Sequence, residues 1–157
     1  MAQENSRLDR IDTKILKLLR KDGRMSWSQL ATEVSLSASA VQRRTESLVE
    51  RGIIRNFTVN LDESALGNGV KAFVEVNVDR QNLEEAEEFR RNIRQLPQVQ
   101  ACHMISGSID FMLEVVAKDV YAFGDFLESE LLRMPAVKDA SSSFVLKLVK
   151  PKEVMIG

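Results

Sequence analysis

The fold of the N-terminal part is decided by residues 26–52, which read SWSQLATEVSLSASAVQRRTESLVERG. Ser26 followed three residues later by Gln29 has the spacing of a capping box, which predicts that a short helix begins there. A serine-rich break follows, and Ser37 is a good N-cap for a longer helix that ends before Gly52. Two short helices joined by a tight turn, the second longer than the first, are typical of a helix-turn-helix.

A further helix is expected directly before this pair. Between Leu8 and Leu19 the apolar side chains recur at helical spacing, and Asp9 and Asp12 occupy the first turn, where the helix dipole favours negative charge. The Asp-Gly pair at 22–23 is typical of a helix end. The first part of the chain is therefore predicted to be a bundle of three short helices.

The third predicted helix has two distinct sides when its residues are placed at 100° intervals. Its apolar side, together with the apolar stripe of the second helix, is expected in the core. These core residues are Trp27, Leu30, Ala31, Val34, Val41, Thr45, Leu48 and Val49.

The opposite side of this helix carries polar and basic side chains at its N-terminal half, which is typical of a helix that enters the major groove of DNA. Arginine is the commonest reader of guanine, and a helix N-terminus favours phosphate. The predicted DNA-binding residues on this helix are Ser37, Ser39, Gln42, Arg43 and Arg44. Arg44 is placed where a phosphate strand would pass. The alternative is an ordinary solvated face on which Arg43 and Glu46 form an ion pair.

Residues 53–61 alternate like a strand with Arg55 exposed. A strand at this position is either a wing beside the helices or a connector, and Arg55 joins the candidate DNA-binding residues. Residues 62–69 contain two glycines and are predicted to form a loop or hinge. The expected division is a helix-turn-helix domain over 1–53, a strand and hinge linker over 54–69, and a second domain over 70–157.

The second domain contains one pattern twice: strand, helix, a Leu/Met-Pro-x-Val joint, strand. The first copy has a strand over 70–78, a helix capped by Asn82 with Leu83 inward, and a strand over 99–106; the second has a strand over 111–117, a helix capped by Asp119 with Val120 inward, and a strand ending near Val149. Two βαβ units predict a ferredoxin-like sandwich. With the helical domain, the fold class is α+β.

Apolar side chains alternate onto both faces of the predicted sheet. The set expected on the face away from the helices is Phe73, Cys102, Met104, Met112, Phe144, Leu146 and Leu148. A small sheet that is apolar on both faces predicts that a second copy of the chain covers the bare one.

Composition limits the function classes. The chain has 157 residues, of which 44% are apolar and 29% charged, a balance typical of folded soluble proteins. No apolar run reaches the ~18 residues of a membrane span, and the first residues lack the apolar core of a secretory signal. A single cysteine fits the reducing cytoplasm. Membrane insertion and secretion are therefore not expected.

The net charge of −1 conceals an asymmetry. Residues 1–62 hold 11 basic and 8 acidic side chains, whereas residues 63–157 hold 11 and 15. The excess of positive charge lies with the predicted helix-turn-helix, where a nucleic-acid partner would require it.

Residues for enzymatic chemistry are scarce. His103 is the only histidine, and its neighbour Cys102 would point to the opposite face of a strand, so the two cannot share one metal ion. The glutamates at 84–88 are expected on a solvated helix surface. The sequence contains no Gly-rich phosphate loop or nucleophile motif. We therefore expect no catalytic residues, no metal site and no cofactor.

Three stretches, 8–16, 36–44 and 48–54, together resemble the N-terminal signature of the Lrp/AsnC (feast/famine) transcriptional regulators. The second half is similar to the effector domain of that family, and Gly107-Ser108-Ile109-Asp110 matches its G-x-x-D turn. The resemblance implies a homodimer built on the effector-domain sheets, assembly of dimers into larger rings such as an octamer, and an amino acid or related metabolite bound between dimers near the turn. Ile109 stands where members often carry an aromatic residue, which leaves the identity of the ligand open.

The resemblance turns a set of otherwise ordinary residues into effector-site candidates. Asp110 could hold an α-amino group, and Gly107 allows backbone N–H groups to face a carboxylate. Met104 and Ile105 could line an apolar side-chain pocket. Ser141 and Ser142 would supply hydroxyls from the last strand. Without the family, the Gly/Asp turn would be an ordinary hairpin connection, and the serines would be merely solvated.

The function expected from the sequence is sequence-specific binding of double-stranded DNA, controlled by an amino acid. The alternatives are an amino-acid-sensing regulatory subunit and a protein-interaction module that does not bind DNA.

Overall fold

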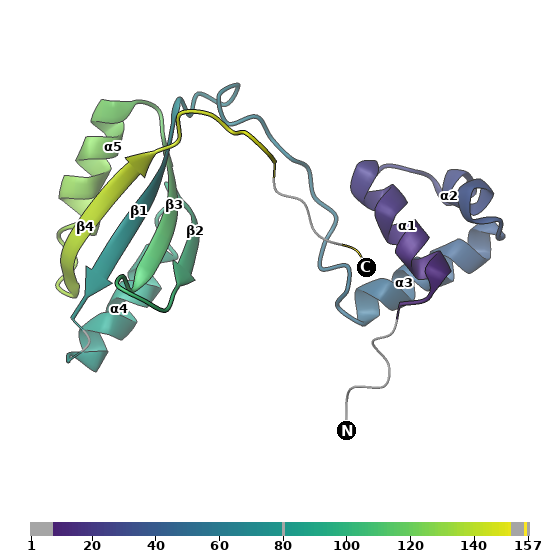
Figure 1. Ribbon diagram of the computed structural model, residues 1–157, viewed down its shortest axis with the longest axis horizontal. Helices are drawn as coiled ribbons and strands as arrows, with labels where there is room; N and C mark the ends of the chain where they lie inside the picture. Colours follow the sequence, from purple (N-terminus) through teal and green to yellow (C-terminus); the bar gives the residue numbers. More distant parts are fainter. Residues whose placement is uncertain (1–7, 80, 152–155, 157) are drawn as a thin grey trace. The chain divides into compact units, whose positions relative to one another are not determined.

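The computed structural model describes residues 8–79, 81–151 and 156. The chain forms two compact units (Figure 1): the first contains the described residues up to Asn60 together with Ile156, and the second is Leu61–Pro151. No helix in the described parts of the chain has the length and apolar character needed to cross a membrane.

The first unit is built from α1 (Arg10–Lys21), α2 (Trp27–Val34) and α3 (Ala38–Glu50). The second and third helices begin where the sequence predicts, whereas Asp9, expected in the first turn of α1, is its N-cap. In each helix a side chain accepts hydrogen bonds from first-turn N–H groups. Asp9 caps α1, Ser26 and Gln29 form the predicted capping box of α2, and Ser37 caps α3. Ser35, in the left-handed conformation with φ of 57°, makes the tight turn between α2 and α3.

The core of this unit lies between the three helices. Ile15, Leu30, Val41 and Leu48 are fully buried. Thr45 is buried as well, because its hydroxyl donates to the Val41 carbonyl oxygen at 2.9 Å and so carries no unpaired polar group into the core. Two expectations are wrong at the edge of this core: Trp27 and Val49 are 36% and 44% exposed. The helical period gives the direction of a side chain, whereas burial depends on which neighbour covers it.

The strand expected over 53–61 does not form. Ile53 and Ile54 both donate to the Leu48 carbonyl oxygen and close the end of α3. Beyond them the chain is extended and belongs to no sheet within the described residues, with Phe57 and Val59 56% and 72% exposed. An alternating pattern makes a strand only where a partner edge is available.

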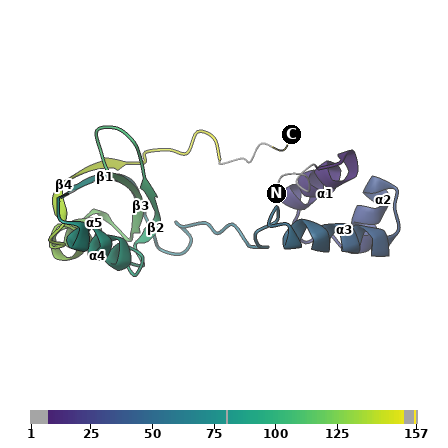
Figure 2. The same ribbon diagram turned by 90° about the horizontal axis from the view of Figure 1, so that it is seen from below.

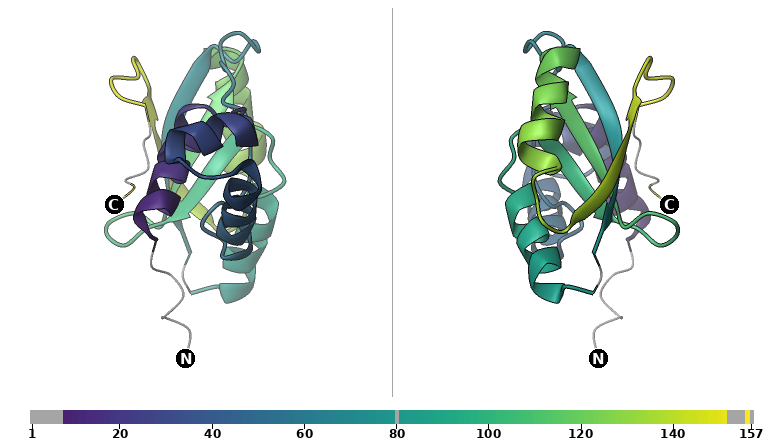
Figure 3. Two further views of the ribbon diagram at one scale, coloured as in Figure 1. Left: turned by 90° about the vertical axis from the view of Figure 1, so that its right-hand side faces the viewer. Right: turned by 90° about the vertical axis from the view of Figure 1, so that its left-hand side faces the viewer.

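The second unit has the predicted order of elements: β1 (Val70–Val78), α4 (Leu83–Ile93), β2 (Val99–Met104), β3 (Phe111–Ala117), α5 (Val120–Phe126) continued by a π-helical turn η1 (Leu127–Leu131), and β4 (Val137–Phe144). The strands are antiparallel in the order β2-β3-β1-β4. Both helices cover one face of the sheet (Figures 2 and 3). This is the ferredoxin-like arrangement, and the α+β fold class is confirmed.

The core of the second unit lies between this sheet face and the two helices. Val74, Val76, Leu113 and Val115 are fully buried, and Phe89 of α4 packs on Phe111 with ring centroids 4.9 Å apart. Leu83 and Val120, the first residues of α4 and α5, are 72% and 58% exposed, so the expectation that they point inward is wrong.

The expectation for the opposite sheet face is wrong for most of its residues. Cys102, Met104 and Phe144 pair with Leu113, Phe111 and Ala72 and therefore share the helix-covered side. Leu146 and Leu148 lie beyond the end of β4. The open face instead holds Phe73 and Met112 beside a charged cluster, in which Glu114 lies 3.0 Å from Lys71 Nζ and 3.6 Å from His103 Nε2. A register shift between Val99 and Ala101 changes which residues of β2 share a face, and such a bulge leaves no clear mark in the sequence.

Candidate functional site

The N-terminal half of α3 presents polar side chains to solvent. Ser37, Ser39, Gln42 and Arg43 are all exposed. Ser37 Oγ accepts from the Ala40 N–H at 3.2 Å and lies 3.1 Å from Ser39 Oγ. Its hydroxyl therefore fixes the first turn of the helix.

Gln42 and Arg43 differ in how they are held. The Gln42 Nε2 donates to Glu46 Oε1 at 2.9 Å, so its amide is oriented along the helix. Arg43 has no ion pair among the described residues. The alternative in which Arg43 pairs with Glu46 is not what the structure shows. The guanidinium of Arg43 is consequently available to a partner outside the chain.

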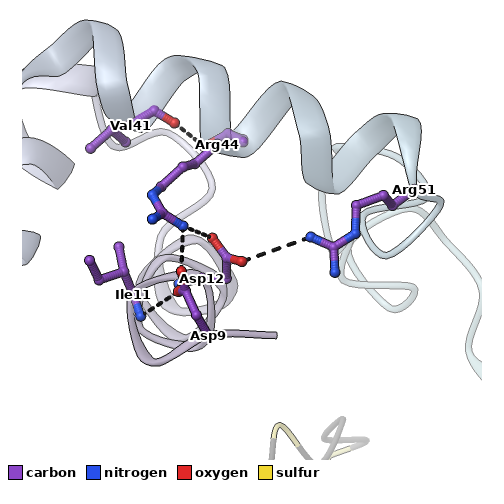
Figure 4. A network of polar contacts seen from close by, with 7 residues as sticks. Asp9, Ile11, Asp12, Val41, Arg44 and Arg51 are labelled. Atoms are coloured by element: carbon purple, nitrogen blue, oxygen red, sulfur yellow. Dashed lines mark hydrogen bonds and ion pairs between the residues drawn. The ribbon is translucent and has the colours of Figure 1, made fainter. Parts of the chain in front are cut away.

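Arg44, which the helical wheel places on a flank of α3 where a phosphate strand would pass, makes its contacts within the chain. Its Nη1 donates to Asp9 Oδ2 and to Asp12 Oδ1, each at 2.7 Å, so the side chain turns from α3 toward the start of α1 (Figure 4). The Asp12 N–H and the Arg44 guanidinium hold the pKa of Asp9 below its usual value, the backbone N–H being the larger cause. Asp12 and Asp9 raise the pKa of Arg44. Arg44 is thus part of an intramolecular network, which gives no support to the expected phosphate contact.

Arg51, at the end of α3, belongs to the same network. Its Nη1 lies 3.8 Å from Asp12 Oδ2, and Figure 4 shows its side chain reaching toward Asp12 from the far end of the helix. The Nε and Nη2 atoms of Arg51 are buried and have no hydrogen-bond partner among the described residues. Asp12, only 6% exposed, is therefore approached by Arg44 of α3 and by Arg51, the C-cap residue of that helix.

Sequence reasoning missed this network. It assigned Asp9 and Asp12 only to the helix dipole and gave Arg51 no role. The one available signal was the spacing of seven between Arg44 and Arg51, which places both on the same side of α3. Arg55, the remaining candidate, is exposed in the extended segment after α3.

In the second unit, three of the predicted effector residues surround one cavity. Met104, Gly107 and Asp110 line an open cavity of about 450 Å³. Gly107 has a φ of 134°, a conformation that side-chain-bearing residues rarely adopt. Ile105, expected beside Met104 in an apolar pocket, lines it too. The remaining lining residues, which the sequence analysis did not assign to this site, are Val78, Leu83, Ala86, Arg90, Ser106 and Phe111.

Asp110 is built into the end of the sheet. Its Oδ2 accepts from the Val78 N–H at 3.0 Å, its own N–H donates to the Val76 carbonyl oxygen, and its carbonyl oxygen accepts from Ile105. These contacts tie the turn between β2 and β3 to the end of β1. Arg90 also lines the cavity; its Nη2 lies 3.1 Å from Glu87 Oε1, and its Nε donates to the Ala86 carbonyl oxygen. A carboxylate, a guanidinium and several apolar side chains therefore surround one cavity.

Ser141 and Ser142 are not at this cavity. They lie on β4, which is separated from β2 by β3 and β1. Ser141 pairs with Glu75 on the open face, whereas Ser142 pairs with Val74 on the helix side. Two hydroxyls that the sequence grouped together therefore point to opposite faces, and the structure does not bring them to Asp110 within one chain.

Cys102 and His103 lie on opposite sides of β2, as the strand period predicts. His103 lies beside Glu114, and burial raises the pKa of the Cys102 thiol. Groups of three or more side chains suited to a metal ion do not occur in the described part of the chain.

Comparison with known proteins assigns both units. Residues 8–55 match the winged helix-turn-helix DNA-binding family, and residues 71–155 match the Lrp/AsnC ligand binding domain. The Bkd operon transcriptional regulator of Pseudomonas aeruginosa is 40% identical over 142 residues, covering 90% of this chain and 93% of the relative. The leucine-responsive regulatory protein of Escherichia coli K12 is 34% identical, covering 95% and 91%.

Solved structures agree with these relatives. A transcriptional regulator from Neisseria meningitidis, crystallised as a complex with L-Met, has a TM-score of 0.89 and 35% identity, covering 92% of this chain and 94% of that one. Escherichia coli AsnC, at 18% identity and a TM-score of 0.87, shows the same fold. The relatives are regulators of transcription, not enzymes. The chain therefore belongs to the Lrp/AsnC family and is a DNA-binding transcriptional regulator with a ligand-binding domain.

Proposed function

We propose that α3 reads base edges in the major groove and that an amino acid bound at the Asp110 cavity changes this binding. The observation that carries the proposal is the exposed N-terminal half of α3, where Arg43 has no ion pair among the described residues while the neighbouring Arg44 is engaged. Ser39, Gln42 and Arg43 would contact bases, and Ser37 and Arg55 would lie near phosphates. An unpaired arginine at this place suits the O6 and N7 acceptors of guanine.

The ligand that best fits the cavity is an amino acid with an apolar side chain. Asp110 supplies negative charge for an α-amino group, and Arg90 supplies positive charge for a carboxylate. Leu83, Met104 and Ile105 would surround an aliphatic or thioether side chain. The L-Met complex of the Neisseria meningitidis regulator supports this class of ligand.

The proposal includes assembly. A homodimer joined through the effector-domain sheets, and dimers joined into larger oligomers such as an octamer, would place the ligand between dimers. Because Ser141 and Ser142 lie at the opposite edge of the sheet from Met104, they would reach the ligand only from a neighbouring subunit. We keep 1–53, 54–69 and 70–157 as the functional division of the chain. The proposed location is the cytoplasm, because a regulator that binds chromosomal DNA has to be in the same compartment as that DNA.

The first experiment separates DNA binding from other roles. The full-length protein is titrated with duplex from its own promoter region at two salt concentrations. A steep loss of affinity with salt is expected, because phosphate contacts release counterions. An absence of DNA binding at both concentrations would overturn the proposal.

The second experiment tests the ligand. A thermal-shift screen of the twenty amino acids is repeated with footprinting on the same promoter. An apolar amino acid is expected to raise the melting temperature and to change the footprint or the assembly state. If amino acids bind and yet leave DNA affinity, footprint and assembly unchanged, the proposed coupling is wrong.

A further inference from the structure

We propose that Arg44 is a positioning residue: with Asp9 and Asp12 it fixes the rotation of α3 about its own axis, and so aims Ser39, Gln42 and Arg43 at the bases. This inference rests on the proposed reading of DNA by α3. It assigns to Arg44 a role in specificity that requires no contact with DNA.

The contacts of Arg44 are tight and partly shielded from water. One nitrogen, Nη1, donates to both carboxylates at 2.7 Å, and the side chains of Arg44 and Asp12 are 33% and 9% exposed. Charge-assisted hydrogen bonds are among the strong ones, and shielding from water weakens screening by salt. The direction of the Arg44 side chain is consequently well defined.

A second tether lies two turns along the same side of the helix. Arg51 approaches the other oxygen of Asp12 at 3.8 Å, and seven residues correspond to nearly two helical turns. Asp12 therefore lies between Arg44 and Arg51 (Figure 4). A rotation of α3 about its axis would pull both arginines away from one buried carboxylate, which opposes that rotation.

Rotation matters because neighbouring residues of a helix differ by 100° in direction. Arg43 directly precedes Arg44, so fixing Arg44 against α1 also fixes Arg43 toward solvent. A bidentate contact with guanine requires this aim, since hydrogen bonds weaken steeply with angle. The contacts of Arg44 with α1 therefore also determine the direction in which the exposed Arg43 points.

Asp9 connects the start of α1 to the same network. Its Oδ1 accepts from the N–H groups of Ile11 and Asp12 at 2.8 and 2.7 Å, while its Oδ2 accepts from Arg44. The cap and the ion pair use different oxygens. Asp9→Asn can therefore remove the charge and keep the cap, because asparagine is an equally good N-cap.

The test uses full-length protein and two duplexes of equal length. One is selected from a randomised library by the wild-type protein, and the other is its scrambled sequence. For each variant we would measure the ratio of the two affinities and the slope of log affinity against log salt. Arg44→Gln is expected to lower the ratio about tenfold and to leave the slope unchanged. A slope lower by about one with an unchanged ratio would show a phosphate contact instead and would overturn the inference.

Asp9→Asn is the matched variant for the partner. It is expected to lower the ratio in the same direction as Arg44→Gln, although it touches no base. The double variant Asp9→Asn/Arg44→Gln should lower the affinity ratio no further than Arg44→Gln alone, because both substitutions remove the same Asp9–Arg44 contact. Additive losses would contradict the inference.

Two controls separate the possible failures. Circular dichroism melting reports whether each variant is folded; if Arg44→Gln is not, Asp9→Asn decides, because its side chain is half-exposed and its cap is retained. A lower ratio of selected to scrambled affinity with an unchanged salt slope then supports the inference. An unchanged ratio overturns it. If the wild-type protein selects no duplex at all, the proposed function fails, and the inference fails with it.

Discussion

The two units of this protein use charge in opposite ways. In the first unit a carboxylate of α1, Asp12, is buried, and Arg44 of α3 and its C-cap residue Arg51 approach it across the helix interface. In the second unit the interior is apolar, and the charged cluster around Glu114 lies on the open face of the sheet. The first unit is the smaller of the two, and a smaller domain buries a smaller fraction of its surface. We therefore expect a buried polar network to matter more to its stability than the exposed charged cluster matters to the second unit. Substitutions in the two units should therefore lower stability for different physical reasons.

The largest effect is expected in the apolar core. Phe89→Ala should lower the free energy of unfolding of the second unit by roughly 3–5 kcal/mol, because it removes a fully enclosed aromatic ring and leaves a cavity. Urea unfolding followed by circular dichroism measures the change. Phe57→Ala, which truncates a ring that is 56% exposed, is the control and should change stability by only about 0.5 kcal/mol. Equal losses for the two variants would contradict the assigned core.

A smaller loss is expected for the polar core of the first unit. Asp12→Ala leaves Arg44 and Arg51 partly shielded without their shared carboxylate. The cost should be roughly 2–3 kcal/mol, below the 3–5 kcal/mol of a fully buried pair, since both arginines reach solvent. The measurement is the urea midpoint, with Asp22→Ala as the control at an exposed carboxylate. If Asp12→Ala is as stable as the control, the network does not hold the helices together.

The outward side of α3 should affect binding and leave folding unchanged. Arg43→Ala is expected to cost about 1–3 kcal/mol in binding to the selected duplex and far less with scrambled DNA. Fluorescence anisotropy on both duplexes measures the difference. The melting temperature should stay at the wild-type value because Arg43 is exposed. An equal loss on both duplexes would show that Arg43 contributes only positive charge.

Substitutions at the ligand cavity should have a smaller effect, which we expect in the affinity for the ligand. Leu83→Ser removes an apolar side chain that is 72% exposed at the cavity. We expect roughly a fivefold loss of affinity for an apolar amino acid, near 1 kcal/mol, from the lost apolar contact. Isothermal titration measures it, and Val120→Ser, at an equivalent first position of α5, is the control. Unchanged affinity would place the apolar side chain of the ligand elsewhere.

The smallest effect concerns pH. The Lys71 ammonium holds the pKa of Glu114 below its usual value of 4.5. A lowered pKa in the folded state means that the ion pair stabilises the protein above pH 4.5 and that this contribution disappears as the pH falls through the lower, folded pKa. Because both side chains are about one third exposed, we expect only about 0.2–1 kcal/mol. Urea unfolding between pH 6 and pH 3 should show a shallower dependence for Glu114→Gln than for the wild type.

Local signals in the sequence predicted most of the helical unit. Caps such as Ser26 and Ser37 and the helical period of Ile15, Leu30 and Leu48 act over a few residues, and the structure confirms them. The strands β1 and β3 also have the bounds that alternation predicts. Hydrogen bonds and side-chain directions over such short distances depend mainly on neighbours along the chain.

Contacts between distant segments could not be predicted in the same way. The strand expected over 53–61 lacks a partner edge within the described residues. Cys102, Met104 and Phe144 lie on the sheet face opposite to the predicted one, because strand register is set by pairing. Of the candidate site, the resemblance grouped Met104, Gly107 and Asp110, and these three residues line one cavity in the structure. It could not show that Ser141 lies across the sheet from them.

The amino-acid order alone specified three N-terminal helices with the caps of the second and third, a duplicated βαβ pattern and a polar row on the third helix, because these follow from periodicity and short-range hydrogen bonding. Only the packing of the helices decided that, of two adjacent arginines, Arg44 has carboxylate partners within the described residues and Arg43 does not. Arg44 meets Asp9 and Asp12, which are 35 and 32 residues away along the chain, while Arg43 stays exposed. Neighbours in a helix point 100° apart, and only the packing of α1 against α3 determines which of the two finds a carboxylate.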